Sequence, residues 1–260
     1  MNNINIHNVL KKYWGFESFR TKQEAIINEV LVQKDTLALL PTGGGKSICY
    51  QIPALIREGI CIVISPLVAL MKDQTSKLQK HNIKAIAITG GLNQHELDIA
   101  LDNCIYGNIK LLYVSPERLE SDLVRERIKK MNVNLIAVDE AHCISQWGYD
   151  FRPSYLKIAE IRALKPECPI LALTATATKK VAKDIQDKLL FKKQNVIQNS
   201  FRRPNLAYMA LEESHKSTRV HKILQKIKGP AIIYVRSRKK THEFSSELNK
   251  LGISSTYYHA

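Results

Sequence analysis

Short apolar runs alternate with amphipathic stretches along the first 200 residues of the chain. The runs are rich in Val, Ile and Leu and are bounded by polar or turn-forming residues, which is typical of buried strands. They occupy residues 36–40, 61–65, 85–89, 111–115, 135–138 and 170–174. The stretches between them space their apolar positions as helices do, and they predict helices over residues 23–32, 67–80, 94–103 and 117–130.

This alternation predicts an α/β fold, a mostly parallel sheet flanked by helices on both faces, because parallel strands need right-handed crossovers. A new cycle begins after residues 199–204. Its predicted strands lie at 206–212, 231–235 and 254–258, and its predicted helices lie near 216–228 and 241–251. A sheet left at that stage would expose an apolar edge. We therefore expect two domains, residues 1–200 and a truncated second at 201–260, in a piece of a longer protein.

A glycine-rich turn follows the first predicted strand, with the sequence Pro41-Thr42-Gly43-Gly44-Gly45-Lys46-Ser47. Glycines let backbone N–H groups approach an anion at a helix N-terminus, so the segment predicts a site for nucleotide phosphates. Lys46 would reach the β- and γ-phosphates, and the Ser47 hydroxyl would bind Mg²⁺. Leu40 stands where the general phosphate-loop pattern has a glycine. A tight structural turn is the alternative interpretation.

A second candidate element is the acidic sequence Asp139-Glu140-Ala141-His142, directly after the predicted strand at 135–138. The carboxyl ends of parallel strands face the ligand crevice. Asp139 would therefore hold the Mg²⁺ shell, while Glu140 would orient and deprotonate the water that attacks the γ-phosphate. The alternative is two solvated acids at a strand end, which the upstream glycine turn disfavours.

Charge is distributed unevenly along the chain. Residues 179–260 hold 18 Lys and Arg against six Asp and Glu, and so carry +12 of the net charge of +15. A basic region attracts a polyanion, and nucleic acid is the first candidate. The alternative is a lysine-rich surface that only keeps the protein soluble.

The five cysteines include no C-x-x-C pair and lie in or beside apolar segments. This pattern favours buried free thiols in a reducing compartment over disulfides or a zinc site. No signal peptide and no run of membrane-spanning length is visible in the sequence. We therefore expect a soluble cytoplasmic protein with no membrane partner.

Several segments together resemble a RecQ-family DNA helicase of superfamily 2. They are residues 16–23, 42–47, 65–74, 139–152, 173–177 and 200–205. The resemblance covers almost the whole chain, and the segment after the acidic sequence is its most specific part. It implies a RecA-like core and ATP-driven, 3′-to-5′ unwinding of DNA in recombination and repair. It further implies Mg²⁺ as cofactor, single-stranded and duplex DNA as partners, and a bacterial-type, nucleoid-associated location.

The same resemblance assigns Phe16, Arg20 and Gln23 to adenine recognition. An aromatic ring can stack on the base, and a glutamine amide can both donate to and accept from the adenine edge. Phe19, by contrast, is interpreted as an ordinary hydrophobic residue. Residues 65–74 match a segment that contacts single-stranded DNA, in which Lys72 would meet phosphates.

Residues 143–152 form an aromatic-rich loop in which Trp147, Tyr149 and Phe151 alternate with Gln146, Asp150 and Arg152. Aromatic faces can stack on unpaired bases, and an arginine can pair with a phosphate or an acid. In the resembled family this loop senses single-stranded DNA and couples it to ATP hydrolysis. An aromatic cluster under a loop is the alternative.

His142 would take part in this coupling between DNA and ATP hydrolysis. Its imidazole would bridge the acids to Gln146 or to the hydroxyls of Thr174 and Thr176. In the resembled family an arginine of the second domain, beyond Ala260, completes the site, and zinc-binding and winged-helix parts follow. We therefore expect these 260 residues to bind Mg-ATP and hydrolyse it slowly without unwinding. The alternatives are an RNA-directed helicase of the same superfamily and a non-catalytic, ATP-gated binding module.

Overall fold

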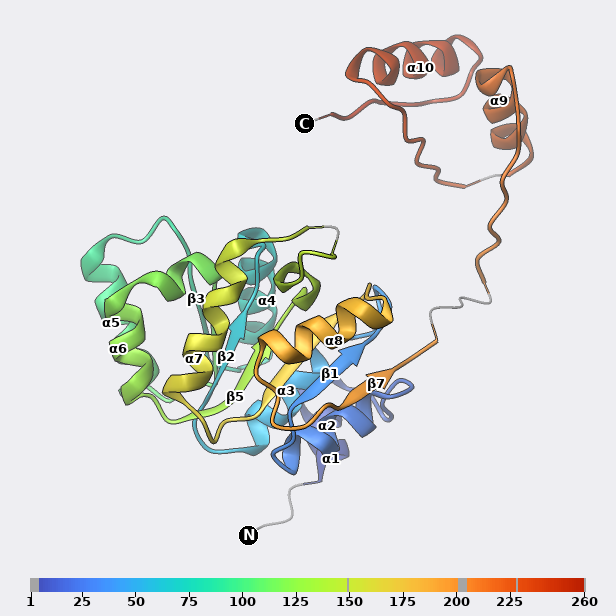
Figure 1. The fold of residues 1–260 in the computed structure, drawn as a ribbon. Helices are drawn as coiled ribbons and strands as arrows, with labels where there is room; N and C mark the ends of the chain where they lie inside the picture. The colour runs from blue at the N-terminus through green and yellow to red at the C-terminus, as the bar shows by residue number, and fades with distance from the viewer. Residues whose placement is uncertain (1–4, 149, 201–204, 228, 260) are drawn as a thin grey trace. The chain divides into compact units, whose positions relative to one another are not determined.

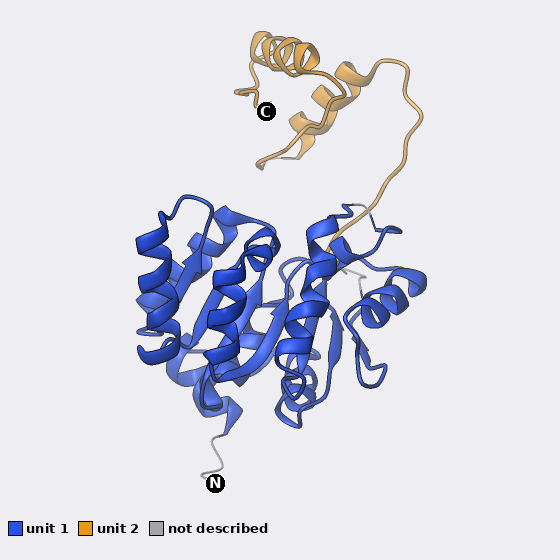
Figure 2. Cartoon of the chain, turned by 60° about the vertical axis from the view of Figure 1, so that its left-hand side comes forward, with its two compact units in different colours: residues 1–203 blue, residues 204–260 orange. Residues whose placement is uncertain are grey.

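The structure is a computed structural model that describes residues 5–148, 150–200, 205–227 and 229–259. The chain divides into two compact units, Met1–Arg203 and Pro204–Ala260 (Figure 2). Each unit is described by itself. The first contains a sheet with helices around it, and the described residues of the second include two helices.

A seven-stranded sheet forms the centre of the first unit (Figure 1). Its strands are β1 (Thr36–Leu39), β2 (Ile60–Ile64), β3 (Ala85–Ile88), β4 (Leu111–Val114), β5 (Val133–Val138), β6 (Ile170–Thr174) and β7 (Val196–Gln198). The order across the sheet is β3-β4-β2-β5-β6-β1-β7, and all neighbouring strands are parallel. The predicted parallel α/β sheet and its six strands are confirmed, and β7 is an additional edge strand.

Helices cover both faces of this sheet, because every strand except the edge strands is apolar toward both sides. The helices are α1 (Ile6–Trp14), α2 (Gln23–Leu31), α3 (Ile48–Ile56), α4 (Val68–Lys80), α5 (Gln94–Tyr106), α6 (Asp122–Lys130), α7 (Ile158–Leu164) and α8 (Lys179–Lys188). Short 3₁₀ helices lie at η1 (Pro116–Glu120), η2 (Ala141–Ile144) and η3 (Pro153–Lys157). Elements α5 to α8 pack against one face, and α2 to α4 pack against the other.

Strand residues alternate between these two layers. Ile136 of β5 packs in the cluster with α5 to α8, whereas its neighbour Ala137 packs in the cluster with α2 to α4. Since all strands are parallel, their carboxyl ends lie at one edge of the sheet, where ligands bind in folds of this class. The glycine turn after β1, the acids after β5 and Thr174 at the end of β6 are therefore brought to the same edge.

A buried ion pair joins the amino-terminal ends of β1 and β6, at the edge of the sheet away from these residues. Arg162 of α7 donates to both carboxylate oxygens of Asp35, at 2.8 and 3.0 Å, just before β1. The backbone N–H groups of Ile170 and Lys192 donate to the same carboxylate. Burial works against the charged form, but these hydrogen bonds outweigh it, and the pKa of Asp35 lies below its ordinary value. The pair thus ties α7, β6 and the segment before β7 to the start of β1.

The second unit contains helices α9 (Lys216–Lys226) and α10 (Arg238–Lys250), which agree with the two predicted helices. The strands predicted at 206–212, 231–235 and 254–258 are wrong, because none of the described residues there forms a strand. A strand needs a partner for its backbone N–H and C=O groups. No strand pairs with these runs within residues 205–227 and 229–259, and large side chains such as Tyr234 and Tyr258 are exposed.

Candidate active site

The glycine turn connects β1 to α3. Gly43 and Gly45 have φ values of 77° and 73°, a left-handed conformation that glycine adopts without strain. A Cβ atom on Gly44 would lie 2.7 Å from the carbonyl oxygen of Pro41, so the backbone is also too close there for a side chain. The hydrogen bonds of α3 begin when the Ile48 N–H donates to the Gly45 carbonyl. The preceding N–H groups, those of Gly45, Lys46 and Ser47, therefore lie at the helix N-terminus, where an anion binds favourably.

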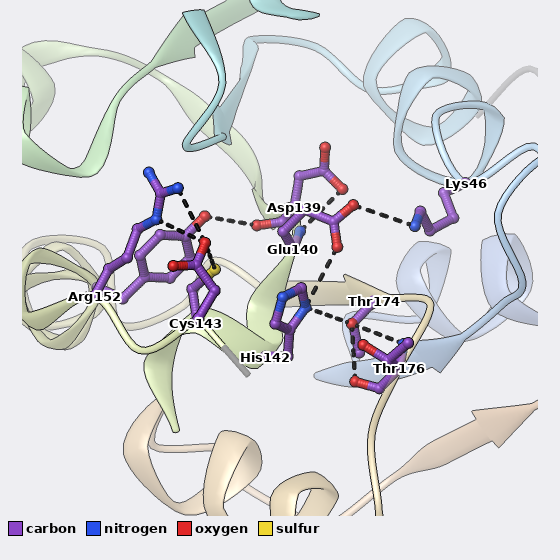
Figure 3. A network of polar contacts seen from close by, with 10 residues as sticks. Lys46, Asp139, Glu140, His142, Cys143, Arg152, Thr174 and Thr176 are labelled. Carbon is purple, nitrogen blue, oxygen red and sulfur yellow. Dashed lines mark hydrogen bonds and ion pairs between the residues drawn. The ribbon is translucent and has the colours of Figure 1, made fainter. Parts of the chain in front are cut away.

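Lys46 and Glu140 lie together at this edge although 94 positions separate them in the chain. The ammonium Nζ of Lys46 is 3.5 Å from Oε1 of Glu140, and both side chains are largely buried (Figure 3). Asp139, the neighbour of Glu140, is buried as well. The glycine turn and the acidic pair therefore line one site and not two separate cavities.

His142 links the acids to the end of β6. Its Nδ1 atom is 3.3 Å from Oε2 of Glu140 and 2.9 Å from the hydroxyl Oγ1 of Thr174 (Figure 3). The Thr174 hydroxyl in turn contacts the backbone of Thr176 and accepts from its N–H at 3.2 Å. Of the partners considered for His142, the structure brings Glu140 and Thr174 to it. Gln146 is exposed, and Thr176 takes part through its backbone.

Glu140 adopts an unusual backbone conformation, with φ at 46° in the left-handed region. Its N–H donates to Oδ1 of Asp139 at 3.0 Å. A non-glycine residue held in this region is strained, and such strain concentrates at functional sites because the surroundings must maintain it. The left-handed turn directs the Glu140 side chain to Lys46 and His142 at the end of the strand (Figure 3).

The charged groups of the site change one another's pKa values. Burial and the charge of Glu140 raise the pKa of Asp139 to about 6, although Lys46 acts in the opposite direction. The hydrogen bond from His142 lowers the pKa of Glu140, with Lys46 adding to the effect against burial. Interaction with the Cys143 side chain and with Glu140 raises the pKa of His142 to about 9. Perturbed carboxylates beside a lysine in a crevice are typical of a functional site.

A buried tyrosine that the sequence analysis did not single out supports the acids. The hydroxyl of Tyr155, in η3, donates to the backbone carbonyl oxygen of Asp139 at 2.9 Å. Arg152 precedes this helix and pairs with Asp150 at 3.0 Å. Its guanidinium also donates to the carbonyl oxygen of Pro66 at 3.4 Å. The loop after the acids is therefore joined both to the end of β5 and to the segment at 65–74.

The residues assigned to adenine recognition are arranged around the glycine turn. The side chain of Gln23 is buried: its amide nitrogen donates to the Gly45 carbonyl at 2.9 Å, and its oxygen accepts from the Arg20 N–H at 2.8 Å. The Arg20 guanidinium donates to the Gly43 carbonyl. Phe16 is 53 % exposed, which leaves its ring available for stacking, whereas Phe19 packs with the hydrophobic cluster of α1 to α3. In this structure the Gln23 side chain is therefore hydrogen-bonded to the glycine turn.

Two of the residues expected to contact nucleic acid are exposed, and two are not. Trp147 is 64 % exposed, and Lys72, on α4, is exposed too. Phe151 and Arg152 are partly buried. Tyr149 lies outside the described residues. Helix α8 contributes two lysines to the aromatic-rich loop that the sequence analysis did not connect with it: Lys180 lies over the ring of Trp147, and Lys188 lies 5.8 Å from the ring centre of Phe151.

The residues present fit a magnesium nucleotide. The N-terminus of α3 offers N–H groups to a phosphate, the left-handed glycines keep side chains away from it, and Lys46 is directed to the same edge as the acids. Mg²⁺ prefers oxygen ligands and keeps contacts to substrate phosphates, and the Ser47 hydroxyl and the Asp139 carboxylate are groups of the kind that it binds. A divalent cation would also stabilise the charged form of the buried Asp139.

The state of the cysteines agrees with the sequence analysis. All five cysteines are buried and free. Within the part of the chain that the structure describes, no helix combines the length and apolarity needed to span a membrane.

Comparison with known proteins places these features in a class. Residues 20–185 match the family described as DEAD/DEAH box helicase, and the chain belongs to this family. The match covers the glycine turn, the acids of β5 and the end of β6.

Within that class the chain is similar to RecQ-type proteins, as the motifs predicted. It is 40 % identical over 98 % of its length to a probable ATP-dependent DNA helicase RecS of Bacillus subtilis (strain 168). It is 42 % identical over 97 % of its length to the ATP-dependent DNA helicase RecQ of Haemophilus influenzae (strain ATCC 51907 / DSM 11121 / KW20 / Rd). The chain spans 52 % and 41 % of these two relatives, about half of their length or less.

Solved structures show the same fold. A DEAD box protein from Methanococcus jannaschii superposes with a TM-score of 0.62 at 20 % identity, over 100 % of this chain and 72 % of that one. The DUF1998 helicase MrfA bound to DNA and AMPPNP superposes with a TM-score of 0.70 at 16 % identity, over 95 % of this chain and 37 % of that one. At these identities the likeness concerns the fold.

Proposed function

We propose that the chain is the ATP-binding part of a RecQ-type, ATP-dependent DNA helicase, with residues 1–200 as its first RecA-like domain and 201–260 as the start of the second. The observation that carries the proposal is the contact of Lys46 with Glu140, at 3.5 Å, next to the glycine turn. The turn and Lys46 would hold the β- and γ-phosphates, while Ser47 and Asp139 would hold Mg²⁺. The bound Mg²⁺ would neutralise charge on the phosphates during hydrolysis.

Glu140 would orient the attacking water and take up its proton at a side-chain oxygen. A lowered pKa keeps it ionised, and Lys46 and His142 each contact one of its two carboxylate oxygens. His142 carries the state of the acids to Thr174 at the end of β6. This chain of contacts would couple hydrolysis to movement of the segment that follows β6, and Gln146 would join it when the aromatic-rich loop moves.

The partner proposed is DNA in single-stranded and duplex form, contacted by Lys72, Trp147, Phe151 and Arg152. Support comes from the exposure of Lys72 and Trp147 and from the link between Arg152 and Pro66. The two relatives described above are named DNA helicases. Phe16, Arg20 and Gln23 would contact the adenine side of ATP. A cytoplasmic, nucleoid-associated location follows from the same proposal.

The test is phosphate release from Mg-ATP under single-turnover conditions, with single-stranded DNA, with single-stranded RNA of the same length, and with neither. We expect slow release that single-stranded DNA stimulates more than RNA. Glu140→Gln is expected to retain ATP binding and to lose release by at least about 100-fold, because the base is removed while the glycine turn is intact. Thermal unfolding with bound ATP serves as the folding control.

Other outcomes would favour a different function or contradict part of the proposal. Stimulation by RNA alone would favour an RNA-directed helicase, and binding without release in the wild type would favour an ATP-gated module. Unchanged release in Glu140→Gln would contradict the role given to this residue. Strand separation by the 260-residue chain would contradict the expectation that it does not unwind alone.

A further inference from the structure

Helix α8 begins with two lysines, Lys179 and Lys180, and has no acidic residue in its first turn. Positive charge at a helix N-terminus opposes the helix dipole. The Thr178 side chain accepts from the Val181 N–H and caps the helix, but it leaves this charge uncompensated. The lysines of this turn therefore contribute little to the stability of α8. The contacts of Lys180 lie outside the helix.

Lys180 contacts the aromatic-rich loop. Its ammonium Nζ lies 3.1 Å from the centre of the Trp147 ring, where the negative face of an indole attracts a cation most strongly. At the other end of α8, Lys188 donates to the carbonyl oxygen of Ile144 at 3.1 Å and lies 5.8 Å from the ring centre of Phe151. A lysine at each end of α8 thus lies next to one aromatic ring of the loop.

The Trp147 side chain remains 64 % exposed although Lys180 lies over its ring. A ring that is in contact with a cation on one face and exposed overall presents its other face to solvent. Bases of single-stranded nucleic acid stack on such faces.

We propose that Lys180 is a positioning residue for nucleic-acid binding: it covers one face of Trp147 and holds the indole so that the opposite face receives an unpaired base. The inference rests on the proposed function, because it takes Trp147 as a contact for single-stranded DNA. It adds a residue of α8 to the residues proposed to bind nucleic acid. It also gives one lysine of the basic region a defined partner, in contrast to lysines that only carry charge.

The experiment uses the 260-residue chain with Trp14→Phe, so that Trp147 is the single tryptophan. In this background Lys180→Met, Lys180→Arg and the control Lys179→Met are compared. Lys179 is the exposed neighbour of Lys180, so Lys179→Met removes the same charge from the same turn. Indole emission reports the contact without nucleic acid, and the anisotropy of a dye-labelled oligothymidine reports affinity. Circular dichroism checks that α8 and the sheet are intact.

Lys180→Met is expected to change the Trp147 emission in the absence of DNA and to weaken oligothymidine binding roughly two- to fivefold more than Lys179→Met does. Lys180→Arg keeps a cation over the ring and is expected to bind as the parent chain does. Equal emission and equal affinity in Lys180→Met and Lys179→Met would contradict the inference.

Trp147→Ala separates this inference from the proposed function. If it weakens oligothymidine binding while Lys180→Met behaves as Lys179→Met, Trp147 binds nucleic acid without help from Lys180, and only the inference is wrong. If Trp147→Ala binds oligothymidine as tightly as the parent chain, the role of Trp147 in the proposed function is wrong, and the inference falls with it.

Discussion

The two units of the chain carry similar apolar patterns and reach different structures. In the first unit, six apolar runs became neighbouring strands of one parallel sheet, and their side chains are buried between two layers of helices. In the second unit, three runs of the same kind form no strand among the described residues. Ile136 of β5 is 0 % exposed, whereas Ile232, in a run that also predicted a strand, is 80 % exposed.

The difference shows what an apolar run specifies. Its sequence favours an extended, partly buried conformation, but hydrogen-bonded neighbours on both sides supply the stability of a central strand. Strand β5 has β2 and β6 as such neighbours. Helices α9 and α10 form in the second unit because their hydrogen bonds lie within each helix, and local sequence is enough to predict them.

The largest expected effect concerns the buried pair of the first unit. Replacement of Arg162 in an Arg162→Met variant leaves the Asp35 carboxylate buried without its partner, and we expect a loss of about 3–5 kcal/mol in the free energy of unfolding. Urea denaturation followed by circular dichroism measures it. The matched change in the second unit is Lys239→Met, which removes an exposed ion pair with Glu243. That change is expected to cost less than about 1 kcal/mol.

Equal effects of the two variants would break the comparison, because they would mean that Arg162 contributes no more than a surface charge. A large loss in Arg162→Met with a small one in Lys239→Met would support it. The hydrogen bonds that hold the pKa of Asp35 below its ordinary value predict the larger loss.

A smaller effect on the free energy of unfolding is expected when one isoleucine in each unit is replaced by alanine. Ile136→Ala removes a buried side chain from a central strand and is expected to destabilise the first unit by about 2–5 kcal/mol. Ile232→Ala removes an exposed side chain and is expected to change stability by less than about 0.5 kcal/mol. The same denaturation experiment compares them. A loss in Ile232→Ala as large as in Ile136→Ala would show that residues 231–235 pack as a strand in solution.

Much of the first unit could be predicted from the sequence, because its six longer strands are apolar runs and the stretches that contain α2, α4, α5 and α6 have helical spacing. Strand β7 could not, since its three residues are at most partly buried and carry no such pattern. The strands of the second unit were predicted wrongly for the opposite reason, since pattern does not report whether a partner strand is present.

The sequence indicated which residues gather at the candidate site, but not all of their contacts. The sequence indicated that Lys46, Asp139 and Glu140 serve one site, and the structure brings Lys46 and Glu140 together. It did not indicate that the buried Gln23 amide donates to the Gly45 carbonyl. Nor did it indicate Tyr155, or that Lys180 of the basic region lies over Trp147, because these contacts exist only once the fold places the residues next to each other.

If Lys46 and the acids after β5 surround a single magnesium nucleotide, calorimetric titration of ATP into the 260-residue chain will detect it. We predict one site whose affinity depends on Mg²⁺, with binding lost in Lys46→Ala and retained in Glu140→Gln. Lys72→Ala, an exposed lysine of α4, is the charge-matched control and is expected to bind ATP as the parent chain does. ATP binding in Lys46→Ala that is as tight and as dependent on Mg²⁺ as in the parent chain would show that Lys46 does not hold the nucleotide.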